Sequence, residues 1–161
     1  MLPRVDTFKK VLFTKRIVAY NENFMPIGGN IHFFPFACIW HEGISGRKKE
    51  DLVSKFFSFF LYYRDAQKLT IWLDNCSSQN KNWCLLSFLV YIVNSSDICA
   101  QEIIFNYFEA RHTFMSADSF HHQVELSLKH QKKTYDFEDF ANAVGATNKG
   151  NVHLKKKYEL F

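Results

Sequence analysis

The stretch Asp74–Asn82 (DNCSSQNKN) carries the residue types best suited to chemistry. Asp74 directly follows Lys68–Leu73 (KLTIWL), a short apolar run that predicts a buried strand. In open α/β sheets, ligand sites gather at the carboxyl ends of such strands. A carboxylate there can hold Mg²⁺ with support from nearby amide side chains, which here are Asn75, Gln79, Asn80 and Asn82. The alternative is an ordinary strand-to-helix turn with an Asx cap.

A second group of possible ligands lies on a predicted helix, Ala117–Lys129. Asp118, His122 and Glu125 are spaced by four and then three residues, so they share one helix face with His121 beside it. Magnesium would favour the carboxylates, with His122 as a further ligand, whereas zinc would favour the histidines. The zinc alternative uses His112, His121, His122 and Glu125. The simplest interpretation is a solvated helix face with an acid in its first turn.

Basic residues accompany both groups. The net charge of +4 is compatible with a polyanionic partner such as DNA but does not require one. The candidate phosphate contacts are Lys81, Lys129, Lys132 and Lys133, with Lys155, Lys156 and Lys157 near the end of the chain. Such runs are more often solvated faces.

The elements that must position these residues begin with two strands and a helix. Lys15–Ile27 and Ile31–Trp40 predict a hairpin across the Gly28-Gly29-Asn30 turn. Pro35 suggests that the second strand lies at an edge or contains a bulge. Lys49–Tyr63 has helical spacing of its apolar residues, and Ser45 is the expected N-cap.

Strands and helices then alternate. The expected elements are a strand at Lys68–Leu73, a helix at Trp83–Val93, a strand at Glu102–Phe108, a helix at Ala117–Lys129 capped by Ser116, and a short helix at Asp136–Val144 ended by Gly145. Val152–Phe161 is a terminal strand or a basic tail. This order predicts an α/β fold whose mixed sheet begins antiparallel and continues with parallel crossovers.

Composition excludes several classes of protein. The 161 residues suit one domain, with a core at about 10–144 and a basic tail at 145–161, and 47% of them are hydrophobic, far too many for a disordered chain. The four cysteines lack C-x-x-C spacing, so no zinc ribbon or thioredoxin-like motif is present. No apolar leader opens the chain, and the run Cys84–Val93 is too short to span a bilayer. We expect no membrane association and an intracellular, nuclear location.

Several blocks resemble one poorly characterised domain family, which recurs in transposon-derived open reading frames of animals. LDNCSSQNKNW resembles its D-N-C-x-x-Q-N-K-N signature, the most specific part of the match. HTFMSADSFHHQVE resembles its G-H-[ST]-x-x-x-x-D-x-x-x-x-x-[IV]-E block, and LPRVDTFKKVLFTKRIVAYN and Cys38–Glu42 resemble its upstream segments. The resemblance runs from about Leu2 to about Val144.

The resemblance implies an RNase H-like fold of the DDE-transposase type, a transposase- or integrase-like nuclease. It places the second catalytic acid on Asp74 and the third on Glu125 or Asp118, with Glu125 preferred because helix-borne acids fill that role. In such enzymes three carboxylates hold two divalent ions, here Mg²⁺ or Mn²⁺, for DNA cleavage or strand transfer. The alternative is a domesticated, non-catalytic module that binds nucleic acid or protein.

Two departures from the family pattern bear on activity. Arg111 stands where the family has the Gly of its G-H block. The family's first acid lies on a strand just before the L-P segment, whereas this sequence begins at Met1-Leu2-Pro3, and Asp6 is in the wrong place to substitute. We therefore expect the first strand to be missing, the strand Lys68–Leu73 to lack one neighbour, and any nuclease activity to be impaired. A homo-oligomer or a missing N-terminal segment would supply the partner.

Overall fold

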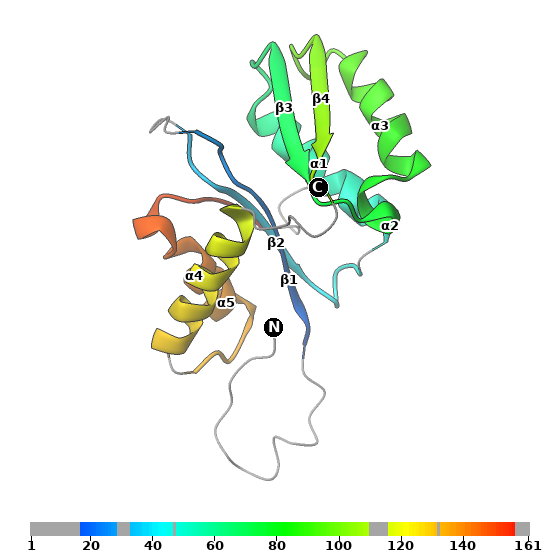
Figure 1. The fold of residues 1–161 in the computed structure, drawn as a ribbon. Helices are drawn as coiled ribbons and strands as arrows, with labels where there is room; N and C mark the ends of the chain where they lie inside the picture. The colour runs from blue at the N-terminus through cyan, green and yellow to red at the C-terminus, as the bar shows by residue number, and fades with distance from the viewer. Residues whose placement is uncertain (1–16, 29–32, 47, 110–115, 132, 157–161) are drawn as a thin grey trace. The chain divides into compact units, whose positions relative to one another are not determined.

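The structure is a computed structural model that describes residues 17–28, 33–46, 48–109, 116–131 and 133–156. The chain divides into two compact units (Figure 1). The first unit comprises Met1–Gly46 and Met115–Phe161, and the second comprises Arg47–Phe114. The predicted α/β class is confirmed. The expectation of one mixed sheet is wrong for the described strands, because β1, β2 and β5 form one sheet and β3 and β4 form another.

The first unit contains a three-stranded sheet in the order β1-β2-β5. The predicted hairpin is confirmed: β1 (Ala19–Phe24) and β2 (Phe36–His41) pair antiparallel. β5 (His153–Lys156) pairs parallel with the other side of β2. Of the two interpretations of the C-terminal segment, the strand is therefore confirmed at residues 153–156.

The expectation that Pro35 marks an edge strand or a bulge is wrong. β2 lies in the middle of its sheet, and its residues pair one-to-one with β1 from Phe36 to His41. Pro35 immediately precedes the strand, and its carbonyl accepts a hydrogen bond of 2.8 Å from the His153 N–H. Proline lacks an N–H and cannot donate to a ladder. Because Pro35 lies outside the β1–β2 ladder, no hydrogen bond between these strands is lost.

Helices α4 (Ser116–His130) and α5 (Phe137–Gly145) supply the rest of the first unit's core. Both match the predicted helices to within one or two residues. The buried residues of this core are Ala37, Ile39, Phe120, Val124, Phe140, Ala141 and Val144. Asp136 caps α5 by accepting a hydrogen bond of 2.9 Å from the Asp139 N–H, which is the usual role of an N-cap aspartate.

The second unit pairs β3 (Lys68–Leu73) with β4 (Glu102–Tyr107) in parallel, and Leu73 lies opposite Tyr107. Helices α1 (Lys49–Tyr62), α2 (Ser77–Asn80) and α3 (Trp83–Val93) complete it. Edge-to-face aromatic contacts pack these elements together. The ring centroids of Phe57 in α1 and Phe88 in α3 are 6.2 Å apart, and those of Phe56 in α1 and Phe105 in β4 are 5.8 Å apart. The short helix α2 was not predicted.

The N-cap of α1 is Lys48 rather than the predicted Ser45. The Asp51 carboxylate accepts a hydrogen bond of 3.0 Å from the Lys48 N–H. An acid at the third helical position, reaching back to the N-cap backbone, fixes the start of the helix without a cap from Ser45.

Two strands have an open side. Within the part of the chain that the structure describes, β3 pairs only with β4, and β1 pairs only with β2. Among the described residues, the Lys68–Leu73 strand therefore has a ladder on one side. A two-stranded parallel sheet is unusual, because parallel sheets are normally covered and extended on both sides.

Candidate functional site

Asp74 is held at the carboxyl end of β3 by its own loop. The Asn80 amide nitrogen donates hydrogen bonds to Oδ1 of Asp74 and, at 3.2 Å, to the backbone carbonyl of Asp74. The Cys76 N–H donates to the same Oδ1 at 3.4 Å. Asn80 is buried, with 8% of its surface exposed. The loop therefore closes around one carboxylate oxygen and fixes the orientation of the acid.

Tyr107 anchors this loop from the neighbouring strand. Its hydroxyl donates a 2.8 Å hydrogen bond to the backbone carbonyl of Asn80, and the Lys81 ammonium lies 4.6 Å from the centre of its ring. Burial raises the pKa of Tyr107, so the phenol stays protonated and remains a donor. Sequence reasoning missed Tyr107, although the carboxyl ends of adjacent parallel strands meet at one edge, and that rule points to it.

The other three amides predicted to support Asp74 have different surroundings. Asn82 caps α3: its Oδ1 accepts a 3.1 Å hydrogen bond from the Leu85 N–H, and its Nδ2 donates to the Gln79 carbonyl at 2.8 Å. The side chains of Gln79 and Asn75 are exposed. Among these four amides, Asn80 alone bonds to Asp74. The alternative interpretation, local turn and capping hydrogen bonds, therefore accounts for much of the motif.

The second oxygen of Asp74 is the chemically available one. Among the described residues, every hydrogen bond to this carboxylate falls on Oδ1, and the side chain is only half-buried. An oriented carboxylate with one unengaged oxygen can ligate a hard cation or accept a proton from a hydroxyl group. A nearby cationic side chain, Lys81, suits the site to a phosphate-bearing ligand.

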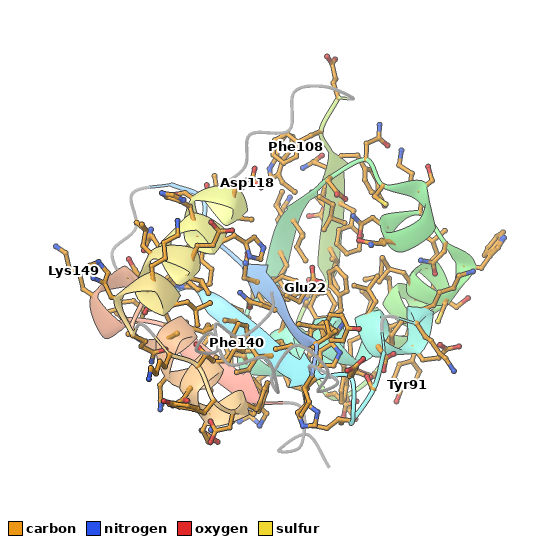
Figure 2. The ribbon with its side chains drawn as sticks, turned by 90° about the horizontal axis from the view of Figure 1, so that it is seen from below. Glu22, Tyr91, Phe108, Asp118, Phe140 and Lys149 are labelled. Carbon is orange, nitrogen blue, oxygen red and sulfur yellow. The ribbon has the colours of Figure 1, made fainter. Side chains whose placement is uncertain are left out.

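The acids of α4 lie on its exposed face in the first unit. Asp118 stands in the first turn of α4, and Glu125 and His122 are also exposed (Figure 2 labels Asp118). His121 contacts β1, with its Nε2 3.1 Å from Nδ2 of Asn23. The predicted helix is thus confirmed, and His121 makes a contact with β1 that the helical pattern did not reveal.

The environment of His121 favours the neutral form of its ring. Burial lowers its pKa, and the carboxylates of Asp118 and Glu125 oppose that effect without cancelling it. Because Nδ2 of Asn23 is a donor, Nε2 of the neutral ring is the acceptor in this contact.

Two asparagines of β1 were missed by sequence reasoning. Both side-chain polar atoms of Asn21 and the Oδ1 of Asn23 are buried without a hydrogen-bond partner among the described residues. Buried amide atoms of this kind are costly unless something pairs with them. The signal in the sequence is the pair of asparagines at alternate positions of a strand, where a core-facing side is normally apolar.

The predicted basic contacts are placed as follows. Lys129 and Lys133 are exposed at and just beyond the last turn of α4. Lys156 binds Glu138, with its Nζ 2.5 and 2.6 Å from the two carboxylate oxygens, so it is engaged within the fold. Lys132, Lys157, His112 and Arg111 lie outside the described residues.

The predicted acids thus fall into two sets. Asp74 belongs to the second unit, while Asp118 and Glu125 belong to the first. Across the described ranges, no group of three or more His, Cys, Asp or Glu side chains is arranged to hold a metal ion. The described residues of each unit therefore show no complete set of metal ligands. Within those same ranges, no helix is long and apolar enough to cross a membrane.

Comparison with known proteins identifies one family. A family model described as a domain of unknown function (DUF7869) matches residues 55–161, about two thirds of the chain. The chain therefore belongs to this family. The match includes Asp74–Asn82 and the α4 acids but begins after β2, so it does not cover the upstream segments. No curated protein and no solved structure matches the chain.

Proposed function

We propose that this member of the DUF7869 family is an RNase H-like domain of the DDE-transposase type, whose activity is metal-dependent cleavage or strand transfer of DNA phosphodiesters. The observation that carries the proposal is the geometry at Asp74. A carboxylate stands at the carboxyl end of a parallel strand, with one oxygen held by Asn80 and the other without a hydrogen bond to any described residue. This is where α/β sheets place their ligand-binding groups.

The order of elements supports the same proposal. An antiparallel pair, β1–β2, comes first in the chain, and the parallel pair β3–β4 with its helices follows. The helix after β4 carries Asp118 and Glu125. An acid after a parallel strand and another acid on a helix further along the chain are the arrangement that the resemblance implies for DDE enzymes.

Each residue has a proposed role. Asp74 is an acidic metal ligand, Glu125 is the acid from α4, and Asp118 is the alternative to it. Asn80 orients Asp74 from behind, and Lys81 contacts a DNA phosphate. When bound, Mg²⁺ or Mn²⁺ would activate the attacking oxygen and stabilise the leaving one.

The activity of this chain is expected to be low. Such a site needs three carboxylates, and the described residues offer Asp74 and an acid of α4. Among the described residues, β1 and β3 each have an unpaired side, so each sheet has room for a further strand. Losing one of three acidic ligands removes much of a two-metal site.

The second candidate function is a non-catalytic module that binds nucleic acid. It is favoured by one observation, that no metal-binding group of three ligands occurs among the described residues. Lys81 over the Tyr107 ring would then be a simple phosphate and base contact at the strand ends. In this case, DNA binding would not depend on Asp74.

Nicking of supercoiled plasmid DNA with Mn²⁺ tests the proposal and separates the two candidates. We expect slow nicking that is abolished by EDTA, by Asp74→Asn and by Glu125→Gln. The matched control is Asp97→Asn, because Asp97 is exposed in the turn after α3, in the same unit as Asp74. DNA binding with no metal-dependent nicking, equal in all these proteins, would overturn the catalytic proposal and leave the binding module.

A further inference from the structure

Helix α3 is apolar on both of its faces. Its sequence, WCLLSFLVYIV, contains no charged residue. Leu85 and Ile92 are buried against the second unit's core. The opposite face exposes Trp83, Leu86, Ser87, Val90 and Tyr91, which recur at helical spacings of three and four residues. A helix that is hydrophobic all round is normally covered on all sides.

This outer face, defined by those five residues, is large enough to be an interface. Exposed fractions reach 82% for Trp83, 66% for Val90 and 62% for Tyr91. With about 150–250 Å² for each aromatic side chain, the face presents on the order of 500 Å². Two such faces together would bury about 1,000 Å², the lower bound for a specific protein interface.

We propose that the outer face of α3 binds the same face of a second copy of this chain, and that the two helices pack antiparallel about a two-fold axis at Ser87. A two-fold axis brings identical patches together, so the patch must be compatible with itself. A patch without charged residues meets this condition, because it brings no like charges together. Ser87 is the smallest residue of the face, which lets the helices approach closely. With Ser87 on the axis, Trp83 lies opposite the partner's Tyr91, and the symmetry makes two such aromatic pairs, one on each side of the axis.

A membrane surface is the less suitable occupant. Helices that bind in the headgroup region carry lysine and arginine on their polar face, and α3 has neither. The small area predicts a weak dimer that dissociates in the micromolar range. This inference does not depend on the proposed catalytic function.

Sedimentation equilibrium of the whole chain, from about 1 to about 200 μM, tests the proposal. The average mass should rise from that of one chain towards that of two. Val90→Lys and Tyr91→Glu should each weaken association by about tenfold or more, since a charge would be buried in an apolar interface. The control is Leu126→Lys, an exposed apolar position (41%) on α4 and outside the face. Circular dichroism confirms that each variant folds.

A chain that stays monomeric over this range would overturn the proposal. A dimer that both variants leave unchanged would overturn it as well, because the interface would lie elsewhere. Binding of the monomeric chain to anionic phospholipid vesicles, lost in Val90→Lys, would assign the face to a membrane instead.

Discussion

The side-chain amide of Asn80 donates to both the carboxylate and the backbone carbonyl of Asp74, six residues earlier in the chain. A single buried side chain thus closes the loop after β3 and sets the direction of the acid. These hydrogen bonds join the Asp-Asn-Cys half of the motif, through Asp74, to the Gln-Asn-Lys-Asn half, through Asn80.

Replacing Asn80 with alanine should destabilise the second unit by about 1–3 kcal/mol, since it leaves the Asp74 carbonyl and carboxylate without their buried donor. Chemical denaturation followed by circular dichroism measures the change. Asn75→Ala is the matched control, because Asn75 is exposed in the same loop. Equal stability of the two variants would mean that Asn80 does not hold the loop.

Removing the Tyr107 hydroxyl should lower the free energy of unfolding by less than Asn80→Ala does, and the size of the loss should depend on whether Asn80 is present. Tyr107→Phe deletes the hydrogen bond to the Asn80 carbonyl but keeps the ring beneath Lys81, so we expect a loss of about 0.5–1.5 kcal/mol. A double-mutant cycle with Asn80→Ala should show coupling of about 0.5 kcal/mol or more. Strict additivity would show that Tyr107 and the loop act independently.

Replacing Asn21 with valine should stabilise the first unit. Its amide atoms are buried without a partner among the described residues, and an apolar, β-branched side chain removes that desolvation cost in a strand. The midpoint of thermal unfolding should rise. Asn23→Val is the comparison and should gain less or lose stability, because it also breaks the contact with His121. A lower midpoint for Asn21→Val would show that something pairs with the amide.

The first unit should lose stability as the solution becomes acidic. Burial, and then the nearby Lys155, lowers the pKa of His153, whose ring stacks on Phe36 at 5.2 Å. The unfolded chain therefore binds the proton more readily than the folded chain. The free energy of unfolding should fall as the pH drops below the usual histidine value of about 6.5 and level off below the folded pKa.

Urea denaturation between about pH 7.5 and pH 5 measures this dependence. His153→Gln should reduce it, and Lys155→Met should reduce it partially by removing the repulsive charge. His121, whose pKa burial also lowers, should account for part of what remains. A pH dependence that is unchanged in both variants would show that His153 is not responsible.

Much of the fold could be predicted from the sequence because its local signals are strong. The strand-forming residues on either side of the Gly28-Gly29-Asn30 turn, the helical spacing in Lys49–Tyr62 and the apolar run before Asp74 each predicted one element. The prediction of an edge strand or a bulge at Pro35 was wrong because the sequence does not distinguish a proline just before a strand from one within it. The N-cap prediction at Ser45 was wrong because the helix begins later, where the Asp51 carboxylate accepts a hydrogen bond from the Lys48 N–H.

The candidate site could be predicted only in part, because helical spacing and strand ends locate residues along one element at a time. Asp74 and the face shared by Asp118 and Glu125 are local features of this kind. The bond from Tyr107 to Asn80 and the contact between Asn23 and His121 join segments far apart in the chain. Such pairs depend on sheet register and helix docking, which composition and spacing do not specify.

Calorimetric titration with Mn²⁺ and Mg²⁺ tests the central claim most directly, on the unmodified chain, on Asp74→Asn and on the control Asp97→Asn. We expect measurable binding to the unmodified chain and to Asp97→Asn, and loss of binding in Asp74→Asn. Binding that persists in Asp74→Asn, or absence of binding to all three proteins, would contradict the assignment of Asp74 as a metal ligand.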